Sequence, residues 1–373
     1  MQTAAKGITG SRQRFVFVDG LRGIAALGIV VFHIWWYEPD PYPALETANG
    51  IMSVEFLDAL FIRIRGGVQI LLVISGFVIA YTLRKTWVTP AELAQFIKRR
   101  LMRLVPAYWV AIGVVILVDF ACRKLSDLTS PFEGELSVTR ISSHLTFLQD
   151  IVGHDPLGAG MWTICIEMQF YFVAVLGWGL AQRMFPRPVA GEPRPSSTGL
   201  LVVFAPVAFI SLFHWRLLDS NDHWVTHFLW MFFLGMVTSW TLDGTISRTI
   251  FAFVVFVALV ELVFDAEWRY ENSLALATAL AIFTAGIRDS LFVWLNWPWL
   301  QYLGKISYSL YLIHFPVCHL VTMTGWKWYS NAPTPFQAST ILLTSFVASL
   351  IAGHILYTLV EAPSAKWAAT AKS

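Results

Sequence analysis

The sequence predicts an all-α polytopic membrane protein with about ten transmembrane helices and both termini in the cytoplasm. Of its 373 residues, 56% are hydrophobic and 13% are charged, whereas about a quarter of the residues of a soluble domain are charged. Apolar stretches long enough to cross a hydrocarbon core of about 30 Å recur along the whole chain. Lys and Arg are concentrated in alternate loops, which gives such a chain an orientation in the membrane.

The apolar stretches give the expected helices in chain order. Most contain about 20 mainly apolar residues, although the fifth is short and the eighth is rich in Ala and Thr. The first resembles a secretory signal peptide because Lys6, Arg12 and Arg14 precede it, but it is too long and no small-residue cleavage site follows it. The expected ranges are 15–36, 66–83, 104–121, 161–181, 200–213, 223–241, 249–264, 273–287, 303–322 and 338–359.

The loops predict which ends face the cytoplasm. About 17 Lys and Arg fall on the side of the termini and about 8 on the other side, and positive residues favour the cytoplasmic side. Residues 1–14 and 361–373 are therefore expected to be cytoplasmic, and 183–198 is expected to be a Pro-rich cytoplasmic linker. The longest external segment, 122–160, could cover a site on the outer side. We find no internal repeat and expect one membrane domain over 1–373.

Several classes of function are disfavoured by composition and spacing. The formal net charge is only +2, and no basic block with interleaved aromatic residues indicates nucleic-acid binding. Cys122, Cys165 and Cys318 lack CxxC or Cys/His spacing, so neither a disulfide framework nor a metal site is expected. HExxH, P-loop and GxSxG motifs are absent. The HxxxxD motif of glycerolipid acyltransferases is also missing, since His33 is followed at that spacing by Glu38.

The first expected helix contains three ionisable residues, Asp19, Arg22 and His33. Each costs about 3 kcal/mol near the middle of a bilayer, which makes each a candidate for function. Arg22 and His33 share one helix face and lie roughly 16 Å apart along the axis. Asp19 precedes Arg22 by one turn and can pair with it. His33 could instead be an inert histidine at the membrane interface, beside the aromatic residues that follow it.

A carboxylate in the fourth expected helix suggests a partner for His33. Glu167 falls about two turns inside the outer end of that helix, at a depth comparable with His33. A carboxylate can orient a histidine base and stabilise the imidazolium that forms when the base takes a proton. A structural ion pair is the alternative.

Three further groups of polar residues are candidates for binding. Arg99, Arg100 and Arg103 at the cytoplasmic face could hold phosphates, or could anchor the helix to anionic lipid. Ser75 lies among small residues of the second helix, whose ordinary role is close helix packing. Tyr311 and His314 share a face of the ninth helix, where five polar residues suggest an aqueous or substrate-lined path.

Five stretches together resemble the bacterial acyltransferase 3 family of integral-membrane proteins, and they occur in the family's order over nearly the whole chain. A sixth stretch, "YTLVEAP" at 357–363, resembles the family's ending. The five are "DGLRGIAALGIVVFH" at 19–33, "GGVQILLVISGFVI" at 66–79, "RRLMRLVPAYW" at 99–109, "WTICIEMQFYF" at 162–172 and "LGKISYSLYLIHFPV" at 303–317.

The resemblance implies a ten-helix domain of the bacterial inner membrane. Such a domain transfers an acyl group, most often acetyl, from cytosolic acyl-CoA to a hydroxyl of a carbohydrate or lipid-linked acceptor, often in the cell envelope. Arg22 and His33 match the family's Arg-x10-His pair, Arg100 and Arg103 match its RxxR motif, and Glu167 matches the acid of its WTxxxE motif.

The sequence departs from the family pattern at two positions. Gln69 stands where an acidic residue is usual in the second helix, and Met168 stands where a second acid often follows the first. Glu167 is therefore the single carboxylate of its motif.

These patterns suggest one mechanism and one alternative. Arg100 and Arg103 would hold the phosphates of acyl-CoA, and the thioester would extend along the stripe marked by Arg22. His33, oriented by Glu167, would then deprotonate the acceptor hydroxyl or be acylated first. The alternative is a proton-coupled transporter or flippase that uses the same polar path.

Overall fold

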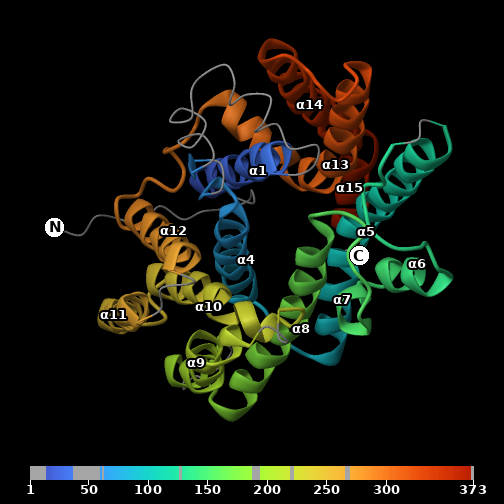
Figure 1. Cartoon of the computed structure of the whole chain (residues 1–373). Coiled ribbons are helices and arrows are strands. Elements are labelled where there is room, and N and C mark those ends of the chain that lie inside the picture. The colour runs from blue at the N-terminus through green and yellow to red at the C-terminus, as the bar shows by residue number, and fades with distance from the viewer. Residues whose placement is uncertain are drawn as a thin grey trace.

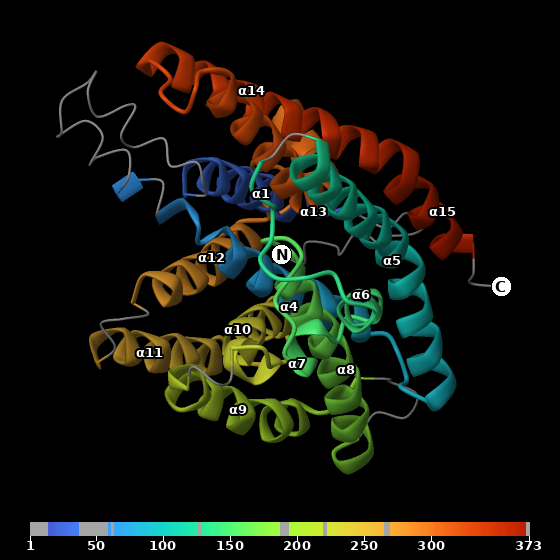
Figure 2. The same cartoon turned by 45° about the vertical axis from the view of Figure 1, so that its right-hand side comes forward.

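The computed structural model describes residues 14–36, 59–60, 63–125, 128–186, 194–218, 222–264 and 269–370. These residues form a bundle of helices (Figures 1 and 2), and within them the only β-pairing is an isolated bridge between Pro186 and Pro195. The predicted all-α class is confirmed. Residues 1–13 of the expected N-terminal segment and 187–193 of the expected linker lie outside the described residues.

All ten expected ranges correspond to long helices. The helices are α1 (Val16–Trp36), α4 (Gly67–Leu83), α5 (Pro90–Phe120), α8 (Met161–Met184), α9 (Ser197–Phe213), α10 (Val225–Leu242), α11 (Arg248–Phe264), α12 (Arg269–Ile287), α13 (Pro298–Trp328) and α14 (Pro335–Leu356). Seven helices in the described part of the chain are long and apolar enough to cross a membrane, and α4 is a shorter apolar helix.

The predicted start of α5 is wrong. The helix begins at Pro90, because Thr89 caps it by accepting a hydrogen bond from the backbone N–H of Glu92 at 3.2 Å. Residues 98–100 carry three positive charges, so the apolar stretch begins only after them, although the helix has already begun at Pro90. Arg99, Arg100 and Arg103 consequently lie on a rigid helix rather than in a loop.

Helix α4 lies between α1 and α10 (Figure 1), and α10 also packs against α9 and α12. The crossing of α4 and α10 depends on Gly76 and Gly235. A Cβ atom added at Gly76 would overlap the carbonyl of Phe232, and one added at Gly235 would overlap the carbonyl of Val73. The expected use of small residues for close packing is confirmed at this crossing.

A second close crossing brings α1 against α13. Gly23 faces the backbone of Gly304 and Leu300, and a Cβ atom at Gly304 would overlap the carbonyl of Asp19. Side chains farther along these two helices can therefore meet across a narrow gap. Helix α13 packs on α14, which lies on the opposite side of the bundle from α9 and α11 (Figure 2).

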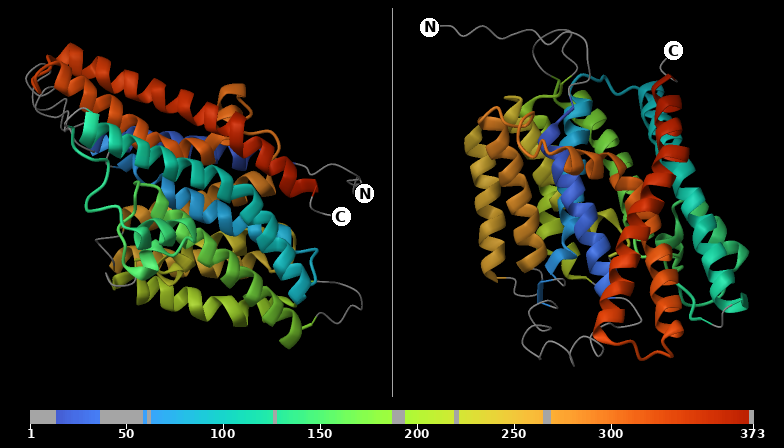
Figure 3. Two further views of the ribbon diagram at one scale, coloured as in Figure 1. Left: turned by 90° about the vertical axis from the view of Figure 1, so that its right-hand side faces the viewer. Right: turned by 90° about the horizontal axis from the view of Figure 1, so that it is seen from above.

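Much of the expected C-terminal tail is helical. Helix α14 continues through a π-helical turn, η4 (Tyr357–Glu361), into α15 (Ala362–Thr370), which packs against α5. Glu361 is buried and accepts a hydrogen bond from Ser309 Oγ at 2.6 Å, which fixes the turn to α13. Helix α1 begins, and α15 ends, at the same end of the bundle (Figure 3).

Between α5 and α8, the chain forms a π-helical turn, η1 (Ala121–Leu125), and two short helices, α6 (Val138–Leu145) and α7 (Gln149–Val152). A 3-10 turn, η2 (Trp215–Leu217), follows α9. The segment from η1 to α7 lies at the end of the bundle where α1 ends (Figure 3).

Candidate active site

Three arginines and one glutamate meet in a narrow cavity of about 120 Å³, which we call the arginine pocket. Arg22 comes from α1, Arg100 and Arg103 from α5, and Glu167 from α8. The other polar residues of its wall are Ser75, Thr163, Tyr171, Ser307, Tyr308 and Tyr311.

The guanidinium groups of this pocket are available for a ligand. No hydrogen bond or ion pair joins Arg22, Arg100 or Arg103 to another residue in the described part of the chain. Arg103 Nε is buried without a hydrogen-bond partner. Arg100 stacks over the ring of Tyr171, with the guanidinium carbon 4.9 Å from the ring centroid. A group that carries negative charge would satisfy these donors.

Glu167 lines the arginine pocket, whereas the sequence suggested it as the partner of His33. It accepts hydrogen bonds from Ser75 Oγ, at 3.3 Å, and from the hydroxyl of Tyr171. His33 lines a different cavity, so the structure does not bring together the residues that the sequence suggested as a pair. On α1 it is Arg22 that shares a cavity with Glu167, whereas His33 shares a cavity with Trp162 and Ile166 of α8.

His33 lines a wider cavity of about 660 Å³, which we call the histidine pocket. Its wall combines imidazoles, carboxylates and aromatic rings from α1, α8, α10, α13, the residues just before α10 and the segment that contains α7. Burial raises the pKa of Asp150 in this wall. The polar and aromatic residues are Phe32, His33, Arg65, Gln69, Asp150, His154, Asp155, Trp162, Asp222, His223, His227, Phe228 and Tyr311.

The two pockets are neighbours. Val68 and Tyr311 line both, so these two side chains form a wall that the cavities share. The hydroxyl of Tyr311 lies 2.6 Å from Thr163 Oγ1, which fixes the ring between the cavities. Of the five polar residues that suggested a path through α13, Ser307 and Tyr308 line the arginine pocket and Tyr311 lines both cavities. Ser309 and His314 line neither.

The partner that the structure gives His33 is another histidine. His33 Nδ1 lies 2.9 Å from Nε2 of His314, and His314 Nδ1 lies 3.1 Å from the carbonyl oxygen of Leu310. His314 is fully buried behind His33 and lines neither pocket. The sequence suggested His314 as a residue that contacts the acceptor, and the structure instead places it behind His33.

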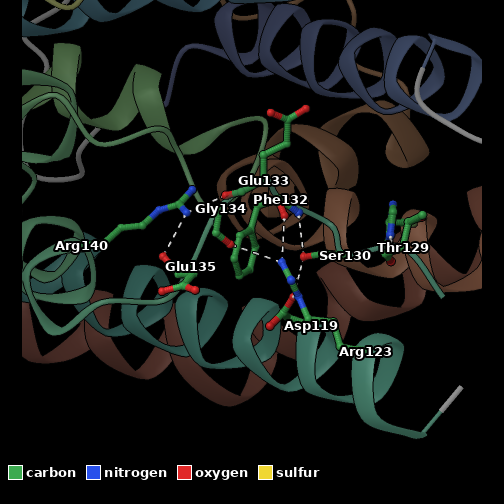
Figure 4. A network of polar contacts seen from close by, with 10 residues as sticks. Asp119, Arg123, Thr129, Ser130, Phe132, Glu133, Gly134, Glu135 and Arg140 are labelled. Carbon is green, nitrogen blue, oxygen red and sulfur yellow. Dashed lines mark hydrogen bonds and ion pairs between the residues drawn. The ribbon is translucent and has the colours of Figure 1, made fainter. Parts of the chain in front are cut away.

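The segment 128–160 closes one side of the histidine pocket, in agreement with its expected role as a cover. Figure 4 shows how it is held: Asp119 on α5 accepts hydrogen bonds from Arg123 Nε, at 2.6 Å, and from Ser130. Arg140 donates to the carbonyl oxygens of Glu133, at 2.7 Å, and of Asp155, at 3.0 Å. The backbone that carries the pocket residues His154 and Asp155 is thereby fixed.

The remaining predicted site residues lie elsewhere. Asp19 forms an ion pair with Arg14 rather than the expected pair with Arg22. Arg99 lies on the same turn of α5 as Arg100 but does not line the arginine pocket. Tyr171 is a site residue that the sequence did not suggest, although its spacing of four from Glu167 places both on one face of α8.

Several known proteins are similar to this chain in sequence. The model of the acyltransferase domain family called acyltransferase 3 matches residues 15–356. The O-acetyltransferase OatA of Staphylococcus aureus is 26% identical over 376 residues, which cover 94% of this chain and 57% of that protein. The peptidoglycan O-acetyltransferase OatA of Listeria monocytogenes is 24% identical over 392 residues, 95% of this chain and 56% of that protein.

The chain thus spans little more than half the length of these two relatives. A third relative, BcsY of Komagataeibacter xylinus, is 26% identical over 314 residues, which cover 80% of this chain and 72% of that protein. No solved structure matches the chain.

Proposed function

Because the chain belongs to the acyltransferase 3 family, we propose that it is a membrane-embedded O-acyltransferase. It moves an acetyl group from acetyl-CoA, which reaches the arginine pocket from the cytosol, to a hydroxyl of a glycan in the histidine pocket. The observation that carries this proposal is the contact between the two pockets at Val68 and Tyr311, with unpaired arginines on one side and His33 on the other.

The arginine pocket fits the thioester arm of the donor or one of its phosphates. Arg22, Arg100 and Arg103 offer planar forks of N–H donors, which suit phosphate and carbonyl oxygens. The cavity is narrow, about 120 Å³, so we place the extended arm of the donor in it rather than the nucleotide. The adenosine part of the donor would remain outside this cavity.

The histidine pocket fits an acceptor of sugar size. Its volume of about 660 Å³ is within the range of small-molecule sites. Trp162 and Phe228 offer apolar faces, and the carboxylates and imidazoles offer hydrogen-bonding groups for hydroxyls. The names of the two OatA relatives, which describe O-acetyltransferases, support a hydroxyl as the acceptor.

His33 supplies the chemistry in either of two routes. In direct transfer, His33 takes the proton of the acceptor hydroxyl while the hydroxyl oxygen attacks the thioester carbon, the C–S bond breaks, and the leaving thiolate receives that proton. In the relay, a nitrogen of His33 attacks the thioester carbon first and releases CoA. The acceptor hydroxyl then attacks the acyl carbon on the histidine, the bond from that carbon to the histidine nitrogen breaks, and the hydroxyl proton passes to the thiolate of the released CoA.

In this proposal the protein crosses the bacterial inner membrane ten times and has both termini in the cytoplasm. The excess of Lys and Arg in alternate loops supports this orientation. Helix α1 starts and α15 ends at the same end of the bundle (Figure 3), as expected when the chain crosses the membrane an even number of times. Donor would then enter near Arg100, and acceptor would enter from the periplasmic side.

The same pair of neighbouring pockets would also suit a transporter, so the test must detect chemistry. Purified protein in lipid nanodiscs is incubated with acetyl-CoA labelled in the acetyl group, and CoA release is measured together with label on the protein and on added glycans. We expect CoA release that depends on the protein and is lost in His33→Ala. His214→Ala is the matched control, because His214 is exposed at the end of α9.

The outcomes separate the two functions. Loss of CoA release in His33→Ala, with wild-type release in His214→Ala, supports acyl transfer. Absence of any release of CoA by the wild-type protein, or full release by a well-folded His33→Ala protein, contradicts it. Transport of a glycan across vesicles without consumption of acetyl-CoA would favour the flippase.

A further inference from the structure

We infer that His314 is a positioning residue that sets the reactive tautomer of His33, in place of the carboxylate that usually has this role in catalytic histidine pairs. The inference rests on the proposed function, because it concerns how His33 acts in acyl transfer. It is carried by the chain of contacts from Leu310 through His314 to His33.

The direction of the hydrogen bonds follows from the last member of the chain. The carbonyl oxygen of Leu310 can only accept, so the nitrogen 3.1 Å from it, His314 Nδ1, carries a hydrogen. In a neutral imidazole the other nitrogen is then an acceptor. His314 Nε2 consequently accepts from His33 Nδ1, which lies 2.9 Å away and carries the hydrogen of that ring.

This order of bonds leaves the lone pair of His33 on Nε2. The two rings are tilted by 40° with centroids 4.9 Å apart, so the bond runs from edge to edge and both rings are held in place. Nε2 is the nitrogen that must take the hydroxyl proton or attack the thioester carbon. His314 therefore keeps His33 in the tautomer that both routes need.

The pair also stabilises the charge that appears on His33. When His33 Nε2 gains a proton or an acyl group, the ring becomes cationic, and Nδ1–H becomes a stronger donor toward the lone pair of His314 Nε2. The full burial of His314 keeps water from competing for this hydrogen bond. No carboxylate is needed at this position, which agrees with the placement of Glu167 in the arginine pocket.

The position of His314 depends on the close crossing of α1 and α13. Gly23 and Gly304 let the backbones approach, and His33 and His314 lie farther along the same two helices. Ser349 on α14 donates to the carbonyl of His314 at 3.5 Å, which links the backbone of α13 to α14 behind the pair. His314 is therefore held by packing on the side away from the pocket.

Two substitutions distinguish a positioning role from simple packing. His314→Phe keeps a planar ring but removes the acceptor, whereas His314→Gln keeps an amide oxygen that can accept from His33 Nδ1–H. We expect His314→Phe to lower kcat for acetyl transfer by on the order of a hundredfold, and His314→Gln to lower it by less than about tenfold. The KM for acetyl-CoA should be unchanged in both variants.

Two further readouts report on His33 itself. The ¹⁵N chemical shifts of the His33 ring should show hydrogen on Nδ1 in the wild-type protein and in His314→Gln. They should show hydrogen on Nε2, or a mixture, in His314→Phe. The acidic limb of the pH profile of kcat should move between the wild-type protein and His314→Phe, since the cationic form of His33 loses the lone pair of His314 Nε2 as an acceptor.

Equal kcat values for His314→Phe and His314→Gln would overturn the inference, as would hydrogen on Nε2 of His33 in the wild-type protein. If the wild-type protein releases no CoA from acetyl-CoA, the proposed function fails instead. The ¹⁵N measurement requires no turnover and would still decide whether His314 sets the tautomer.

Discussion

The hydroxyl of Tyr311 lies 2.6 Å from Oγ1 of Thr163 and holds the tyrosine ring between the arginine pocket and the histidine pocket. Gly160, which precedes α8, makes room for this ring, because a Cβ atom there would lie 2.7 Å from a ring carbon of Tyr311. The proposed donor and acceptor would meet beside this side chain. Its ring is thus placed to control what passes between the two cavities.

Removal of the Tyr311 ring should uncouple donor consumption from transfer. In Tyr311→Ala, water from the histidine pocket gains access to the thioester, so acetyl-CoA hydrolysis without acceptor should rise relative to glycan acetylation. Tyr311→Phe keeps the ring and loses only the bond to Thr163, which is worth about 1 kcal/mol. The ratio of CoA released to acetyl transferred, measured for both variants, checks the prediction. An unchanged ratio in Tyr311→Ala would exclude a barrier role for the ring.

Arg103→Gln should weaken binding of the donor and leave binding of the acceptor unchanged. A hydrogen bond to a charged group contributes about 1.5–3 kcal/mol, so the KM for acetyl-CoA should rise by roughly 10- to 150-fold when chemistry is slow. Titration calorimetry with CoA gives the affinity directly. Arg248→Gln, at an exposed position at the start of α11, is the matched control. Unchanged affinity in Arg103→Gln would contradict the phosphate or thioester role of this arginine.

The helices of this fold were predictable because lipid requires long apolar stretches, and all ten expected ranges are helical. The start of α5 was missed because charged residues 98–100 interrupt the apolar stretch. The signal for the true start was nonetheless present: Thr89, Pro90 and Glu92 form a helix N-terminus that an apolar window does not detect.

The members of the site were more predictable than their pairing. Arg22 and His33 lie on one face of α1, and helical periodicity alone places them there. The contact between His33 and His314 joins residues 281 positions apart, and it depends on how α1 and α13 pack at their glycines. The placement of Glu167 and His33 in the walls of different cavities is also a property of packing that no single segment encodes.

Gly76→Ala and Gly235→Ala should each destabilise the protein. The added methyl group would overlap backbone atoms of the facing helix, which cannot move aside as a side chain can. Overpacking of this kind typically costs about 1–3 kcal/mol. Gly113→Ala is the control, because nothing lies within 4 Å of a Cβ atom at that helical position. Thermal unfolding in detergent should show lower transition temperatures for the first two variants only, and equal temperatures for all three would contradict the close crossing of α4 and α10.

The cover of the histidine pocket should loosen in acid because of His144. Burial, together with the charges of Arg140 and His154, lowers the pKa of His144 to about 4 from its ordinary value of 6.5. The ring is neutral in the folded protein: Nδ1 donates to the carbonyl of Arg140 at 2.8 Å, and Nε2 accepts from the backbone N–H of Leu157 at 3.0 Å. A proton on Nε2 removes the acceptor for the N–H of Leu157, so the hydrogen bond that holds Leu157 to α6 is lost.

The sign of the effect follows from the lowered pKa of His144. Between pH 6.5 and about 4 the unfolded or opened segment binds a proton that the folded segment does not, so stability is complete above pH 6.5 and falls as the pH decreases toward 4. Hydrogen exchange of residues 153–157, corrected for the intrinsic effect of pH, should therefore lose protection over this range. His144→Asn should show lower protection that no longer depends on pH. An unaltered pH dependence in this variant would assign the loosening to another group, such as the neighbouring His154.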